Sequence, residues 1–130
     1  MKYLMNDGKK NLARKIFQET LRIISEKDEH PEKVFERAIE NIKPNLEVRA
    51  KRIGGAVYQI PVEVKPNRQI ALAFRWIIAG SRSSKGAPMA KKLANELMAA
   101  ANGEGSAVKK KEDTMKMALA NKAFAHYARY

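Results

Sequence analysis

The sequence predicts a mainly α-helical fold, a helical bundle of about five to six helices from which one β-hairpin protrudes. Apolar residues recur at three- and four-residue spacing along most of the chain, which is the pattern of a helix with one buried face. One segment alone, residues 46–65, alternates apolar with other residues on both sides of a Gly-Gly pair. With 130 residues, of which 45% are hydrophobic, we expect a single domain over positions 1–130 with its own core.

Two helices are expected before the hairpin. Apolar residues repeat at helical spacing from Lys9 to Ser25. A second helix is expected to open at Pro31, since the N–H that proline lacks would be unpaired at a first helical position, and Pro44 ends it. Residues 1–6 read as the last turn of an earlier helix.

The register of the hairpin is predicted from its apolar faces. The apolar residues of the two strands share one face if Ala50 lies opposite Tyr58. That pairing leaves residues 53–55 as a three-residue loop with a glycine in the left-handed conformation. The alternative is a two-residue turn at the Gly-Gly pair, which sets Lys51 opposite Tyr58 and mixes charged with apolar side chains. We therefore expect the three-residue loop.

Three helices are expected after the hairpin. Asn67 is predicted to cap a helix that reaches about Arg82. The next is expected from Met89 to Ala101, and its many alanines indicate close helix packing. The last is expected to begin near Lys109. Its buried stripe is predicted from apolar residues at helical spacing, namely Met117, Ala120, Phe124 and Tyr127.

The charge balance predicts a polyanionic partner. Lysine and arginine number 26 against 14 acidic residues, which gives a formal net charge of +12. A surplus of this size favours nucleic acid as the partner. Six of the acidic residues, against three basic ones, fall within positions 26–42, so one helix is acidic while its surroundings are basic. We expect that helix to face away from the nucleic acid.

The sequence predicts no enzyme, no metal site and no cofactor. The chain has no cysteine, and its two histidines, His30 and His126, are far apart in the sequence. The serines at 81, 83 and 84 lack the histidine or carboxylate that a catalytic nucleophile needs. No apolar run approaches the roughly 18–20 residues of a spanning helix, and no signal peptide is recognisable, so no membrane partner is expected.

Basic residues gather in four separate elements, and these are the candidate RNA-binding groups. Each group taken alone is also consistent with a solvated surface. Aromatic residues make up only 7% of the chain, so contacts to phosphates and 2′-hydroxyls of folded RNA are favoured over base stacking. The alternative is an architectural DNA-binding protein with a basic β-ribbon arm, although the Gly-Gly tip lacks the apolar wedge of such proteins. The candidate cations are Lys9, Lys10, Arg14, Arg49, Lys51, Arg52, Arg68, Arg75, Lys109, Lys110 and Lys111.

Five segments together resemble one family. They are LMNDGKK (4–10), LEVRAKRIGGAVYQIPVEVKPNR (46–68), LAFRW (72–76), LANELMAAAN (93–102) and AVKKKEDTMKMALANKAFAHY (107–127). In this order they resemble the seventh protein of the small ribosomal subunit, of the bacterial or organellar type, over nearly the whole chain. The resemblance implies a six-helix body with a hairpin between the third and fourth family helices. It also implies that this chain lacks the family's N-terminal tail and most of its first helix.

The resemblance implies a function in the ribosome of the cytoplasm or of an organelle. It implies a structural protein that binds the 3′ major domain of small-subunit ribosomal RNA and starts assembly of the head of the subunit. It further implies a position beside the tRNA exit site, near the outgoing messenger and near neighbouring proteins of the head and platform. The candidate cations would then meet ribosomal RNA. The residues implied to form the tip that faces the exit site are Ile53, Gly54, Gly55 and Ala56.

Overall fold

The computed structural model describes residues 10–129, and within them the chain is mainly α-helical with one antiparallel hairpin between the second and third helices. The predicted fold class is confirmed. The predicted helix end at residues 1–6 and the candidate Lys9 lie outside the described residues. The elements are α1 (Lys10–Ser25), α2 (Pro31–Ile42), β1 (Leu46–Ile53), β2 (Ala56–Glu63), α3 (Pro66–Ser83), α4 (Met89–Ala101), α5 (Ser106–Ala120) and the 3-10 helix η1 (Lys122–Arg129).

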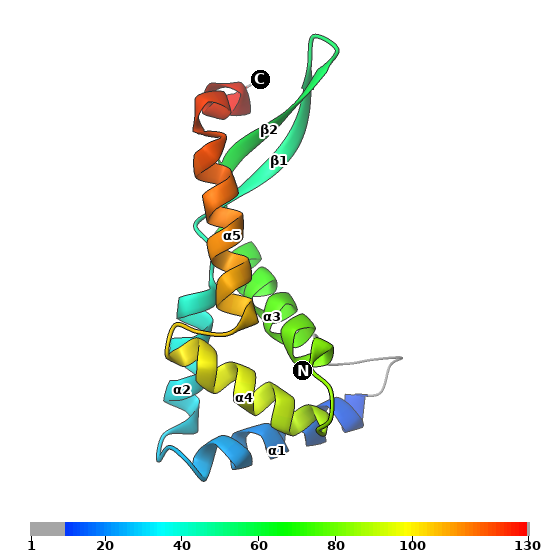
Figure 1. Ribbon diagram of the computed structural model, residues 1–130, viewed down its shortest axis with the longest axis vertical. Helices are drawn as coiled ribbons and strands as arrows, with labels where there is room; N and C mark the ends of the chain where they lie inside the picture. The colour runs from blue at the N-terminus through cyan, green and yellow to red at the C-terminus, as the bar shows by residue number, and fades with distance from the viewer. Residues whose placement is uncertain (1–9, 130) are drawn as a thin grey trace.

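The molecule has a helical body at one end and the hairpin arm at the other (Figure 1). Helices α1 to α4 form the body, and α5 rises from it, so that its C-terminal half and η1 lie beside the two strands. The strands therefore pack on one side against α5 and η1, and the ring centroids of Tyr58 and Phe124 are 5.2 Å apart at this contact. The turn of the hairpin is the part of the arm farthest from the body.

Helix α4 lies at the centre of the body and packs against α1, α2, α3 and α5. Its buried side chains are mostly alanines, which allow the neighbouring helices to approach closely. Ile24, Ile42 and Leu97 are among the fully buried side chains, and burying a side chain of this size stabilises the fold by about 1.5–3 kcal/mol. Asn41 of α2 donates hydrogen bonds to the carbonyls of Ala100 (2.8 Å) and Ala101 (3.2 Å) in the last turn of α4.

The predicted hairpin register is wrong by one residue. Lys51 lies opposite Tyr58 and Ile53 opposite Ala56, so Gly54 and Gly55 alone form the turn. Their φ angles are 56° and 85°, and a two-residue turn of this kind needs positive φ at both positions. The turn geometry therefore outweighs the matching of apolar faces. The face shared with Tyr58 carries three charged residues of β1, which are Glu47, Arg49 and Lys51.

Two helix starts and the last apolar stripe also differ from the prediction. Helix α3 starts at Pro66, with Lys65 as the capping residue, so Asn67 lies inside the helix. Helix α5 starts at Ser106 rather than near Lys109 and ends at Ala120, where the chain tightens into η1. Met117 (53% exposed) and Ala120 are exposed and Ala118 is buried instead, so this part of the predicted stripe is wrong. Phe124 is half-buried, and the side chain of Tyr127 lies outside the described ones. The bounds predicted for α2 and α4 are confirmed.

Candidate nucleic-acid interface

The exposed cations of α1 divide into those with and those without an ion pair among the described residues. Lys10 and Arg14 are exposed at the start of the helix, whose first turn contains no acidic residue. Arg22, on the same helix, donates hydrogen bonds to Glu19 (3.0 Å) and Glu26 (2.6 Å). The bond from Arg22 lowers the pKa of Glu19, and the two carboxylates raise the pKa of Arg22. Arg22 therefore has protein partners, whereas Lys10 and Arg14 remain available to a ligand.

The three cations of the arm lie on opposite faces of the hairpin. Arg49 and Lys51 share the face of Tyr58, which packs against η1, and Arg52 lies on the other face opposite Val57. At the tip, Gly54, Gly55 and Ala56 are exposed and Ile53 is half-buried. A Cβ added at either glycine would meet nothing within 4 Å, so the tip is surrounded by open space.

Arg68 is predicted to bind RNA, and the structure gives it a protein partner. Its Nε lies 2.7 Å from Oε1 of Glu47, and its Nη2 lies 3.2 Å from Oε2. Glu47 is only 7% exposed, and Arg49 also approaches its Oε1 at 3.5 Å. The hydrogen bond from Arg68 lowers the pKa of Glu47, against the effect of burial, and Glu47 raises the pKa of Arg68. This ion pair joins the first turn of α3 to the base of the arm.

The cations of α3 and α5 differ in exposure. Arg75 and Arg82 are exposed on α3. Lys109, Lys110 and Lys111 are consecutive on α5, and consecutive residues of an α-helix point about 100° apart. Lys111 is accordingly half-buried, whereas Lys109 and Lys110 are exposed.

A carboxylate from another helix determines where α5 begins. Oε1 of Glu96, on α4, accepts hydrogen bonds from the backbone N–H of Ala107 (3.0 Å) and from the hydroxyl of Ser106 (2.9 Å). The first turn of α5 contains no acidic residue, and Gly105 before it has no side chain to cap the helix. Glu96 therefore supplies both the cap and the negative charge that this helix end favours. The sequence prediction missed it because the cap is not local.

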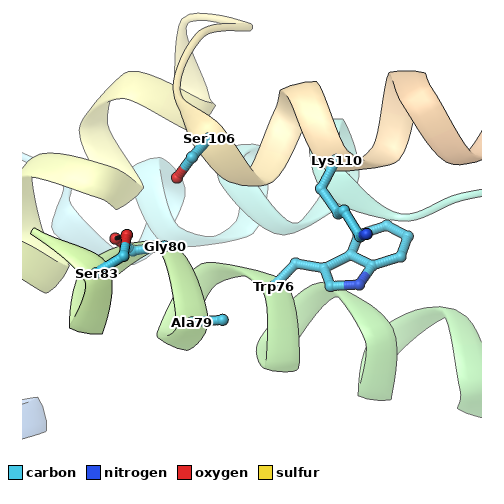
Figure 2. A pocket seen from close by; sticks show the side chains of 6 residues that line it. All are labelled: Trp76, Ala79, Gly80, Ser83, Ser106 and Lys110. Carbon is cyan, nitrogen blue, oxygen red and sulfur yellow. Dashed lines mark hydrogen bonds between the residues drawn. The ribbon is translucent and has the colours of Figure 1, made fainter.

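A shallow pocket of about 260 Å³ lies between α3 and the start of α5 (Figure 2). Of its lining residues only Lys110 was predicted to be a binding residue. The aromatic Trp76, next to Arg75 in the segment LAFRW, was the one signal in the sequence that could have indicated it. The pocket is lined by Trp76, Ala79, Gly80, Ser83, Ser106 and Lys110.

Two further kinds of site are absent from the described part of the chain, residues 10–129. Among the side chains that the structure describes, no group of three or more histidine or acidic residues is placed to bind a metal ion. None of the helices within this range is long and apolar enough to cross a membrane.

The fold and its surface define a class: a basic helical protein with a protruding two-stranded arm. The family model for ribosomal protein S7p/S5e matches residues 1–122, and the chain belongs to this family. It is therefore a structural protein of the small ribosomal subunit that takes part in translation, and the expectation that it is not an enzyme is confirmed.

Proteins of three bacteria show how similar this chain is to its relatives. The small ribosomal subunit protein uS7 of Nitratidesulfovibrio vulgaris (strain DP4) is 58% identical over 125 residues, which cover 95% of this chain and 80% of that protein. The protein of the same name from a Nitratiruptor species is 58% identical over 126 residues, or 95% and 81% of the two chains. That of Thermotoga maritima is 54% identical over 125 residues, again 95% and 81%.

Proposed function

We propose that this chain binds the 3′ major domain of small-subunit ribosomal RNA and starts assembly of the head of the subunit. The observation that carries the proposal is a set of exposed cations on α1, the arm, α3 and α5. None of them forms an ion pair with a carboxylate within residues 10–129. They are Lys10, Arg14, Arg52, Arg75, Arg82, Lys109 and Lys110.

The spread of these cations over four elements supports recognition of a folded RNA. Phosphate contacts from separate elements bind strongly and depend on salt, but each carries little sequence information. Together they recognise the shape of an RNA whose phosphates lie at matching positions. The exposed carboxylates of Glu32, Glu36 and Glu40 make α2 the side that faces away from RNA.

The arm supports a second part of the proposal, a place beside the tRNA exit site. A two-stranded ribbon alone is marginally stable in water, but here its base is held by the Arg68–Glu47 pair and its face by α5 and η1. The arm therefore has a fixed direction. Residues 53–56 at its tip face the exit-site tRNA and the outgoing messenger in this proposal. Neighbouring proteins of the head and platform are the remaining partners.

Footprinting tests the RNA part of the proposal. Hydroxyl radicals are applied to a transcript of the 3′ major domain with and without the chain. We expect protections that gather in a few strands of that domain. Weak protections spread evenly over the transcript would contradict the proposal, because they would indicate a general polycation.

Directed cleavage tests the position of the tip. The chain has no cysteine, so Ala56→Cys creates a unique site for an iron-based cleavage reagent. Glu36→Cys on α2 is the control, since this position is exposed and lies in the body. In assembled subunits we expect cleavage of exit-site tRNA from position 56 and none from position 36. Equal cleavage from both, or none from position 56, would overturn this placement.

A further inference from the structure

We infer that the pocket between α3 and α5 binds one unstacked nucleotide of the RNA, with the base against Trp76 and the phosphate at Lys110. The inference rests on the proposed function, since it takes RNA as the partner. It adds recognition of a single base to an interface otherwise made of phosphate contacts.

The two helices present one side each to the pocket (Figure 2). Trp76, Ala79, Gly80 and Ser83 follow one another at intervals of three, one and three residues, which places them along one side of α3. The α5 side consists of Ser106 and Lys110, one turn apart. The volume of about 260 Å³ is just below the roughly 300–1,000 Å³ of sites for small molecules. A pocket of this size suits the base of one nucleotide rather than a whole cofactor.

The floor of the pocket is open because its residues are small. Ala79 and Gly80 have the two smallest side chains of the lining, and a Cβ at residue 80 would clash with the Ser106 hydroxyl. Glycine at this position therefore lets α5 start close to α3. A flat aromatic wall beside a small-residue floor is a surface on which a base can stack.

The polar groups of the pocket complement a nucleotide. The hydroxyl of Ser83 donates to the carbonyl of Gly80 (2.8 Å), and that of Ser106 donates to Glu96 (2.9 Å). Both hydroxyl protons are thus used within the protein, so these oxygens offer acceptors to a ligand. Base amino groups and the ribose 2′-hydroxyl are donors that match them.

The cation of the pocket matches the phosphate. Lys110 forms no ion pair within the described residues, and in Figure 2 its ammonium end points toward the indole of Trp76. Arg75 and Arg82 lie four and three residues from Ala79, on the exposed side of α3 next to the pocket. An RNA strand that follows these cations passes the mouth of the pocket.

Intrinsic fluorescence tests the inference directly, because Trp76 is the one tryptophan of the chain. The full chain is titrated with the 3′ major domain transcript while filter binding measures affinity independently. Ala79→Leu fills the pocket. Position 79 is exposed on α3, and the helix tolerates leucine there because leucine is a good helix former. Lys110→Gln removes its cation, and Lys116→Gln removes an exposed cation of the same helix that does not line the pocket.

We expect the transcript to quench Trp76 fluorescence in the wild type. We expect Ala79→Leu to remove the quenching and to weaken binding about 5- to 150-fold, the effect of losing one stacked base. Lys110→Gln should weaken binding more than Lys116→Gln. Thermal melting followed by circular dichroism checks that all variants are folded.

Two results would overturn the inference, and they are distinguishable. If the transcript binds tightly but neither fluorescence nor Ala79→Leu responds, and the two lysine variants weaken binding equally, the pocket holds no nucleotide while the proposed function stands. If filter binding detects no complex with the wild type, the proposed function itself fails, and the inference fails with it.

Discussion

Arg68 and Glu47 form a bidentate ion pair that joins α3 to the base of the hairpin arm. The Nε–Oε1 distance is 2.7 Å and the Nη2–Oε2 distance is 3.2 Å. Parallel hydrogen bonds between a guanidinium and a carboxylate fix orientation as well as distance. The pair therefore determines the direction in which the arm leaves the body. It also occupies an arginine that would otherwise be available to RNA.

Glu47→Gln tests the contribution of this pair to stability. The pKa of Glu47 is lowered from its ordinary value of 4.5, chiefly by the bond from Arg68. A carboxylate with a lowered pKa stabilises the fold above its unfolded-state pKa, and that stability is lost as the pH falls through the folded-state pKa. Because 42% of the Arg68 side chain is exposed, we expect a loss of only about 1 kcal/mol at pH 7.

Urea unfolding at pH 7 and at pH 3 measures this loss. The difference between wild type and Glu47→Gln should shrink as the pH falls below 4.5. Glu63→Gln is the control, because Glu63 is exposed at the end of β2 and forms no ion pair within the described residues. A difference of the same size at both pH values would show that the charge of Glu47 is not what stabilises the base of the arm.

Arg75→Gln is expected to lower the salt dependence of RNA binding. Each phosphate contact that is lost reduces the slope of log K against log salt by about 0.9. Arg22→Gln is the matched control, because Arg22 is also exposed but is bound to Glu19 and Glu26. Its slope should stay at the wild-type value. If both variants gave the same slope, Arg75 would not be a phosphate contact of the RNA interface.

Gly54→Val is expected to loosen the arm without unfolding the body. The φ of Gly54 is 56°, and a residue with a Cβ in this left-handed region costs about 1–2 kcal/mol. No atom lies within 4 Å of such a Cβ, so the cost is one of backbone conformation alone. Gly54→Asn should be tolerated, because Asn-Gly suits this turn.

Amide hydrogen exchange over residues 46–63 separates these outcomes. Faster exchange is expected for Gly54→Val and nearly unchanged exchange for Gly54→Asn. The same increase in both variants would contradict the two-residue turn.

Glu96→Ala is expected to destabilise the chain by about 1 kcal/mol, because it removes the cap of α5. The first turn of α5 should fray, which changes the amide shifts of Ala107 and its neighbours. Glu104→Ala is the control, since Glu104 is exposed in the preceding loop. Equal effects of the two variants on thermal unfolding would mean that Glu96 does not act as a cap.

Sequence signals within or next to a helix correctly predicted α2 and α4. Pro31 and Pro44 bracket α2, and the alanine-rich segment from Met89 to Ala101 is α4. The start of α5 and the burial of Glu47 on the hairpin depend instead on residues far along the chain. Glu96 caps α5 from a different helix, and Glu47 tolerates burial because its partner Arg68 lies 21 residues further on. Sequence rules that consider only neighbouring residues cannot identify partners that lie so far apart in the chain.

For the candidate site, too, local features were predicted and contacts between distant residues were not. Composition and spacing predicted which elements are basic, because charge is visible in the sequence. They did not predict that Arg68 pairs with Glu47, nor that three consecutive lysines of α5 point in different directions. The pocket was missed because Trp76 and Lys110 come together only when α3 packs against α5.

The most direct test of the proposed function is binding of the 130-residue chain to a transcript of the 3′ major domain at two salt concentrations, with duplex DNA as competitor. We expect tight binding that weakens with salt but survives excess DNA, because the cations match the shape of one folded RNA. Weak binding that is lost equally to salt and to DNA would contradict it, and would leave only a general attraction between opposite charges.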